Sequence, residues 1–196
     1  MVASNPMKIS GAWHQGYVLD YHTLSSDFIG HDEFGNPMFD TKRTEAGELL
    51  YQLKYKRNTD ALDALVKLAA LFVRKWSPSV DALVTVPPTR VRRPQPLVEL
   101  ATGLAQSLNL PFLDGFVRNV KITKEIKNVF EYNERIKLLE GACRFRDQSL
   151  RGRSVLLLDD LYRSGATLNA VTKILYDEGQ CSIVYALALT RTRTTS

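Results

Sequence analysis

Short, nearly continuous apolar runs punctuate the chain and are separated by stretches with apolar residues at helical spacing. The runs lie at 82–86, 155–158 and 183–189, and runs this short are typical of strands covered on both faces of a parallel sheet. The stretches with helical spacing are 44–53, 60–73, 97–108 and 168–176. Strands that alternate with helices predict an α/β fold with a doubly wound, mostly parallel sheet flanked by helices.

Two carboxylates, Asp159 and Asp160, directly follow the run at 155–158, and the small and hydroxyl residues of 163–167 come next. In open α/β sheets ligands bind beyond the carboxyl ends of the strands, and a loop that enters a helix offers N–H groups and a dipole that favour an anion. Carboxylates are better suited to sugar hydroxyls, directly or through the water shell of a metal. Phosphate on the loop and a diol on the acids together describe a ribose 5-phosphate. The alternative is an ordinary βα turn with a capping Ser or Thr.

This stretch resembles the phosphoribosyl pyrophosphate (PRPP) motif of type I phosphoribosyltransferases, in which an apolar strand, two acids and a Thr-Thr-Gly-x-Thr-like loop follow one another. The resemblance implies that Asp159 and Asp160 are catalytic, hold the ribose, and contact Mg²⁺ through the ribose or water. It places the 5-phosphate on Arg163, Ser164, Gly165, Ala166 and Thr167. Arg163 departs from the small hydroxyl residue that is usual at its position.

Basic residues gather after the run at 82–86. Two prolines end that strand, and Arg90, Arg92 and Arg93 crowd the segment before the next helix. Guanidinium groups this close repel one another unless an anion offsets their charge, so the segment is a candidate pyrophosphate site. The residues assigned to pyrophosphate are Lys54, Pro88, Thr89, Arg90 and Arg92. The alternatives are a surface basic loop here and a solvated basic face at 54–57.

Several segments resemble the ComF-like or amidophosphoribosyltransferase-like branch, which is associated with competence. The matches are Lys54-Tyr55 before a helix, Val86-Pro87 before arginines, and Arg135 with a return at 141–145. The chain lacks the N-terminal zinc-binding cysteines of many members, and Arg93-Pro94-Gln95-Pro96 replaces their Arg-Gly-Phe-Asn-Gln segment. The resemblance implies a PRPP- and Mg²⁺-binding phosphoribosyltransferase with an unknown acceptor. The alternatives are a PRPP or nucleotide sensor without turnover and an accessory protein of DNA uptake.

Residues 1–57 are expected to form an arm and a small hood beside a core at 58–196. The first ten residues should be a loose arm. The alternation at 13–19 predicts strands, and 32–37 is typical of a turn. Aromatic side chains of this region are candidates for the acceptor pocket, with a place in a small core as the alternative: Trp13, Tyr17, Tyr21 and Phe34. Its histidines and aspartates match no common zinc spacing, so polar residues of a hairpin are preferred to a metal site.

Between the last two helices, the pattern predicts a strand at 116–120, a short helix at 133–139 and a strand-like return at 141–145. Residues 121–132 are polar and weakly patterned, so we expect a mobile loop that closes over the site.

Composition narrows the class of protein. The 196 residues are 44% hydrophobic and 24% charged, as in a soluble globular domain. Because no apolar run could span a membrane and no signal-peptide core is present, we expect a cytoplasmic protein with no membrane partner. Two cysteines make no disulfide framework. A net charge of +5 suits an anionic ligand, PRPP or another phosphorylated ribose, and permits weak contact with nucleic acid. A homodimer is compatible with the fold, since related folds often pair.

Overall fold

A five-stranded sheet forms the centre of the computed structural model, which describes residues 2–88, 93–115, 117–119, 143–145 and 149–193. The order of its strands is β1 (Met7–Ile9), β2 (Gln15–Tyr21), β9 (Ile183–Arg191), β8 (Ser154–Tyr162) and β5 (Ala82–Thr85). Only β1 is antiparallel to its neighbour, whereas β2, β9, β8 and β5 pair in parallel. The predicted α/β class with a mostly parallel sheet is confirmed.

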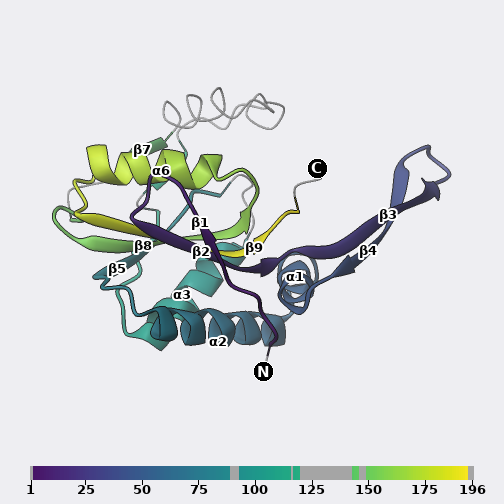
Figure 1. Cartoon of the computed structure of the whole chain (residues 1–196), viewed down its shortest axis with the longest axis horizontal. Helices are drawn as coiled ribbons and strands as arrows, with labels where there is room; N and C mark the ends of the chain where they lie inside the picture. The colour runs from purple at the N-terminus through teal and green to yellow at the C-terminus, as the bar shows by residue number, and fades with distance from the viewer. Residues whose placement is uncertain (1, 89–92, 116, 120–142, 146–148, 194–196) are drawn as a thin grey trace.

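Helices cover both faces of this sheet (Figure 1). Helix α6 (Ala166–Asp177) lies on one face, and α2 (Thr59–Trp76) and α3 (Pro96–Leu108) lie on the other. The predicted helices at 60–73, 97–108 and 168–176 are therefore confirmed, and each is longer than predicted by one to three residues at one or both ends. Within the described part of the chain, every helix is too short or too polar to cross a bilayer.

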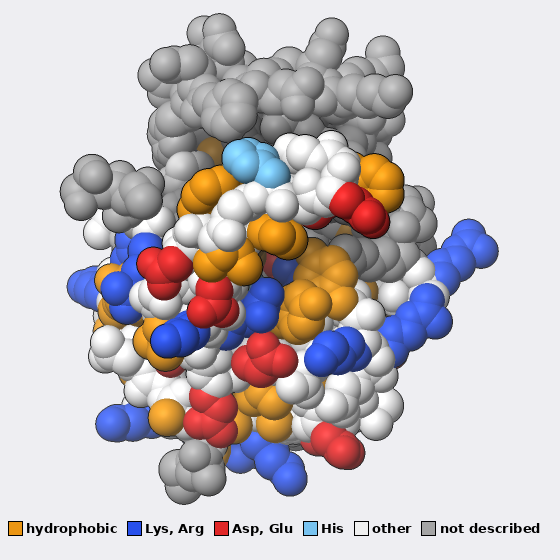
Figure 2. Space-filling view, turned by 90° about the vertical axis from the view of Figure 1, so that its right-hand side faces the viewer, with side chains coloured by type: hydrophobic (Ala, Val, Ile, Leu, Met, Phe, Trp, Pro, Cys, Tyr) orange, Lys and Arg blue, Asp and Glu red, His pale blue; other side chains and the backbone are white. Residues whose placement is uncertain are grey.

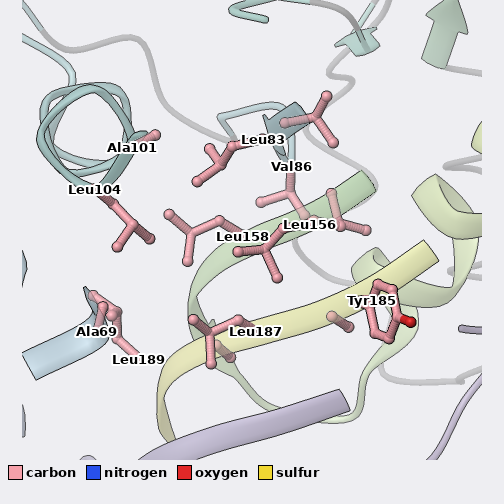
Figure 3. Close-up of a cluster of buried hydrophobic side chains, with 14 of the residues drawn as sticks. Ala69, Leu83, Val86, Ala101, Leu104, Leu156, Leu158, Tyr185, Leu187 and Leu189 are labelled. Atoms are coloured by element: carbon pink, nitrogen blue, oxygen red, sulfur yellow. The ribbon is translucent and has the colours of Figure 1, made fainter. Parts of the chain in front are cut away.

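One part of the core lies between the sheet and the α2–α3 layer. Leu156 and Leu158 of β8 and Leu187 and Leu189 of β9 have exposed fractions of 1% or less. Figure 3 shows them beside side chains of β5, α2 and α3, which are Leu83, Ala69, Ala101 and Leu104. Because side chains alternate across a strand, the residues between these leucines lie toward α6. Burial on both faces explains why the runs at 155–158 and 183–189 show no polar alternation.

Two smaller antiparallel pairs lie outside the main sheet. The strands β3 (Thr23–His31) and β4 (Pro37–Arg43) form a hairpin that projects from the body (Figure 1). Asp32 closes the turn by accepting hydrogen bonds from the backbone N–H groups of Phe34 and Asn36, which confirms the predicted turn. The second pair is β6 (Val117–Asn119) with β7 (Cys143–Phe145), within the predicted strand and return. The predicted closing loop at 121–132 and helix at 133–139 lie outside the described residues.

The prediction of a loose arm for residues 1–10 is wrong at Met7–Ile9. These residues pair with β2, in the register Met7 with Val18 and Ile9 with Gly16. The Ile9 side chain is 5% exposed, and the Trp13 indole N–H donates to the Ile9 carbonyl at 3.1 Å. Burial of an apolar side chain and pairing of the free edge of β2 together stabilise a strand that Pro6 and the polar residues before it do not suggest.

Helix α1 (Glu45–Tyr51) begins where it was predicted to begin. The Thr44 hydroxyl accepts from Gly47 N–H at 2.9 Å and donates to the Tyr21 carbonyl at 2.6 Å, so it caps the helix and ties it to β2. The predicted helix to residue 53 instead continues into a π-helical turn, η1 (Gln52–Lys56), which ends at Arg57 in the left-handed conformation. This turn places Lys54 at the edge of the main sheet, next to Asp160 of the neighbouring strand β8 (Ser154–Tyr162).

Candidate functional site

The connections that follow β5 and β8 lead in opposite directions. After β5 the chain passes through α3 and returns beside β5 on its outer edge. There the backbone N–H of Leu83 donates to the Pro111 carbonyl, and the N–H of Leu113 donates to the Leu83 carbonyl. After β8 it passes through α6 to β9, on the other side. Such a divergence opens a crevice beyond the carboxyl ends of the two strands, where α/β proteins bind ligands. The backbone N–H of Val86 donates to the Leu158 carbonyl at 3.1 Å, so the ends of β5 and β8 meet there.

Both predicted acids lie at this edge, and a lysine from the N-terminal segment meets them. Asp159 and Asp160 are half-buried, and the backbone N–H of Asp160 donates to Asp159 Oδ1 at 2.8 Å. Lys54 Nζ lies 2.8 Å from Asp160 Oδ2. The sequence assigned Lys54 to pyrophosphate and Asp160 to ribose, and the fold brings these two side chains from distant parts of the chain into direct contact.

Asp159 has an unusual pKa. Burial, and secondly the negative charge of Asp160, raise the pKa of Asp159 to about 7, against the opposing effects of the Asp160 N–H and Lys54. Near neutral pH Asp159 is therefore only partly ionised. An additional cation close to these carboxylates would favour their ionised form.

The loop after β8 closes a small pocket together with Asp159. All residues from Leu161 to Leu168 line it. Gly165 is the N-terminal cap of α6 and has φ +78°, in the left-handed region that favours glycine, and a Cβ there would lie 2.9 Å from the Tyr162 hydroxyl oxygen. The Ala166 N–H is 3.5 Å from the Ser164 hydroxyl. The structure thus brings the five predicted loop residues and Asp159 to one pocket.

Asn169 supports this loop from beneath, and the sequence analysis missed it. Its side-chain N–H donates to the Gly165 carbonyl at 3.0 Å, while its Oδ1 accepts from the backbone N–H of Ala12 at 2.7 Å. Asn169 is 8% exposed. An Asn among the mostly apolar residues of 166–175 is the sequence signal that could have identified it, since buried amides need partners.

A second pocket lies beside Lys54, between η1 and the start of α3. Its lining includes Tyr55, Arg57 and Arg93, and the Arg57 guanidinium donates to the Arg93 carbonyl at 3.3 Å. Pro88 is exposed just beyond β5. The basic patch at 54–57 and the end of the predicted arginine segment are therefore neighbours, while Thr89, Arg90 and Arg92 lie outside the described residues.

Comparison with known proteins agrees with this geometry. No family model matches the chain. The competence protein ComFC of Bacillus subtilis is 26% identical over 147 residues, which are 74% of this chain and 59% of that protein. The adenine phosphoribosyltransferase of Trypanosoma brucei, solved with AMP, pyrophosphate and ribose-5-phosphate, superposes with a TM-score of 0.52 and 12% identity over 96% of this chain and 75% of that one.

The protein has the type I phosphoribosyltransferase fold. It is also a distant homologue of ComFC, although the match spans only 59% of the length of that relative. Both statements confirm the resemblance seen in the sequence.

Further residues adjoin the acids on the phosphoribosyltransferase-like sheet, and the sequence did not single them out. The Thr190 hydroxyl donates to the Asp160 carbonyl at 3.2 Å and lies 3.2 Å from His22 Nδ1. Burial, followed by the charges of Lys54 and Arg43, lowers the pKa of His22. His22 directly follows β2, so its imidazole lies at the same edge of the sheet as the two acids.

The aromatic candidates for an acceptor pocket are dispersed. Trp13 is buried in the core, and Tyr17 packs against Phe72 and Trp76 of α2, so the core alternative holds for both. Phe34 lies at the hairpin turn and is 81% exposed. Tyr21, at the carboxyl end of β2, lies with its ring 4.8 Å from the Arg193 guanidinium and is the member of the set closest to the site edge.

Replacing Asn169 with Ala should destabilise the protein by about 1–3 kcal/mol, because the buried Gly165 carbonyl loses its side-chain donor and the Ala12 N–H loses its acceptor. Thr172, one turn along the same helix, is the matched control. Its hydroxyl is fully buried and finds no partner among the described residues, so Thr172→Val should cost nothing or stabilise. Urea unfolding of the two variants measures both effects. Equal losses from the two substitutions would show that Asn169 is only a packing residue.

Asp159→Asn should make the protein more stable than the wild type, by an amount that depends on pH. The folded carboxyl ionises near pH 7 and the unfolded one near its ordinary value of 3.8, so the wild type loses stability as pH rises through this interval. The gain from Asn should grow over the same interval and level off above it. Thermal unfolding at a series of pH values measures it, with Asp177→Asn, an exposed carboxyl, as the control. A gain that does not change with pH would contradict the assigned ionisation.

Proposed function

We propose that the protein binds PRPP together with Mg²⁺ and transfers its phosphoribosyl group to an acceptor. The observation that carries the proposal is the Lys54–Asp160 ion pair beside the pocket of the 163–167 loop. A cation, two carboxylates and a phosphate-sized pocket at one edge of the sheet match a sugar with an anion at each end. The ion pair alone would also fit other anionic ligands. The 163–167 loop adds a binding place for a second anionic group, as PRPP requires.

Each part of PRPP has its own set of residues in this proposal. The 5-phosphate lies on Arg163, Ser164, Gly165, Ala166 and Thr167, where backbone N–H groups and hydroxyls donate. The ribose hydroxyls donate to Asp159 and Asp160. The pyrophosphate is held by Lys54, Pro88, Thr89, Arg90 and Arg92, of which Lys54 already stands at the acids. In the ligand-bound state Lys54 would divide its charge between Asp160 and the pyrophosphate.

The carboxylate pair suits Mg²⁺, which prefers oxygen ligands and keeps several waters when it binds through one or two carboxylates and substrate phosphates. Asp159 and Asp160 would hold the ion through water or the ribose hydroxyls. When bound, Mg²⁺ neutralises charge on the pyrophosphate leaving group. The raised pKa of Asp159 supports this assignment, because a carboxyl that resists ionisation beside Asp160 gains from a nearby cation.

The reaction breaks the bond between the anomeric carbon and the pyrophosphate oxygen, and the electron pair leaves with pyrophosphate. A lone pair of the acceptor forms the new bond at that carbon. Positive charge develops on the ribose in between, and the two carboxylates favour it electrostatically. Lys54 offsets the negative charge that grows on the leaving group.

A second candidate is an accessory role in competence without turnover. The similarity to the competence protein ComFC supports it, and a PRPP or nucleotide sensor would use the same residues. Arg163, where the family motif has a small hydroxyl residue, fits tight binding as well as it fits catalysis.

Replacing both acids (Asp159→Asn with Asp160→Asn) should abolish calorimetric binding of PRPP in the presence of Mg²⁺ while the protein stays folded. The reason is that the ribose hydroxyls lose charged acceptors and the ion loses its carboxylates. The control is Asp63→Asn with Asp177→Asn, two exposed acids of α2 and α6 that change the net charge equally. Unchanged PRPP affinity in the first variant would refute the role of the acids.

Transfer and sensing are separated by incubation of the protein with PRPP, Mg²⁺ and a panel of purine and pyrimidine bases, amines and ammonia. Release of pyrophosphate that requires one acceptor identifies the enzyme and its substrate, because the leaving group departs only as the new bond forms. Tight PRPP binding with no release for any acceptor would favour the sensor. Absence of both binding and release would overturn the PRPP proposal as a whole.

A further inference from the structure

The β3–β4 hairpin stands apart from the rest of the molecule. It extends away from the sheet on the side of α1 (Figure 1), and most of its residues from Leu24 to Asp40 are exposed. A nine-residue strand is about 30 Å long, so the turn lies well beyond the body. A two-stranded hairpin is at best marginally stable in water unless something covers one of its faces.

Large apolar side chains lie uncovered along this hairpin. Phe28 and Phe39 are directly opposite each other in the register, their ring centroids are 5.7 Å apart, and they are 55% and 52% exposed. Leu24, Ile29, Phe34 and Met38 are also exposed. Figure 2, which faces the projecting side of the molecule, shows hydrophobic side chains gathered there among acidic ones. An apolar surface of this size with a polar rim is typical of an interaction site.

The charge of the hairpin is opposite to that of the chain as a whole. From Leu24 to Thr41 there are four acidic residues and no Lys or Arg, whereas the full chain has 26 basic and 21 acidic residues. Asp27 is directly opposite Asp40, a like-charge arrangement that is unfavourable across a strand pair. Among the described residues, neither of the two forms an ion pair.

We propose that the hairpin is a docking arm that binds the positively charged body of a second copy of this chain. Its phenylalanines would be buried in the contact, and Asp27 and Asp40 would meet lysines or arginines of the other copy. All 26 basic residues, but only 17 of the 21 acidic ones, lie outside Leu24–Thr41. The body of a second copy therefore offers a surface of complementary charge. Reciprocal docking closes a dimer with two equivalent contacts.

The charges also argue against the simplest alternative, a dimer in which the two hairpins pack against each other. If two hairpins packed face to face, the four acidic residues of one would lie against the four of the other, with no basic residue between Leu24 and Thr41 to separate them. Like charges brought together in this way oppose association. A hairpin on a basic body lacks that repulsion, and the inference is independent of whether the protein binds PRPP.

Sedimentation velocity on the full chain without ligand tests the arm. The wild type should be a dimer at concentrations of about 50 µM, and Phe28→Ser with Phe39→Ser should weaken dimerisation by at least about tenfold. Asp27→Lys with Asp40→Lys, and added salt, should also weaken it, because both remove the charge attraction. Leu71→Ser is the control, since Leu71 is 50% exposed on α2. Far-ultraviolet circular dichroism checks that each variant is folded.

Zero-length coupling of carboxylates to amines locates the contact. In a mixture of ¹⁵N-labelled and unlabelled protein, Asp27 or Asp40 of one copy should couple to lysines outside the hairpin of the other. A monomeric wild type would overturn the proposal and leave a different protein as the partner of the hairpin. It would be overturned equally by a dimer that the phenylalanine substitutions leave intact.

Discussion

The arrangement of the site depends on the mutual repulsion of two neighbouring carboxylates near the end of a buried strand. Asp159 and Asp160 lie in β8 directly after four fully buried residues. Both acids are themselves half-buried, which reduces their hydration. The fold meets this cost in two ways, with Lys54 at 2.8 Å from Asp160 and with a raised pKa for Asp159. Thr44 ties α1 to β2, and η1 follows directly, so the placement of the lysine depends on how the N-terminal segment packs.

The phosphate-type loop depends on the N-terminal segment as well. Asn169 joins the Gly165 carbonyl to the Ala12 N–H, and Ala12 lies between β1 and β2. The N-terminal segment, which the sequence analysis placed in an arm and hood, therefore supports both the loop and Lys54. A rigid support of this kind matters because a loop with a left-handed glycine otherwise has many accessible conformations.

Sequence reasoning reached the elements whose pattern is local. Val155–Leu158 predicted a strand because it is buried on both faces, and Thr44 predicted a helix start because it carries its own capping oxygen. The continuation of β8 through the acids to Tyr162 was not predictable, since it depends on pairing with β9. Met7–Ile9 became a strand only because β2 offered a free edge.

The candidate site was predictable to the same extent. Residue type and order identified the acids and the loop, and basic clustering identified Lys54, but no local pattern joins Lys54 to Asp160 or reveals the two partners of Asn169. Charge has different consequences in the two acidic regions. At the site, burial turns repulsion into a shifted pKa and a lysine contact, whereas on the exposed hairpin water and salt screen Asp27 and Asp40. The acidic residues of the hairpin therefore reduce the stability of the fold little. Their main effect is to determine which surfaces the hairpin can bind.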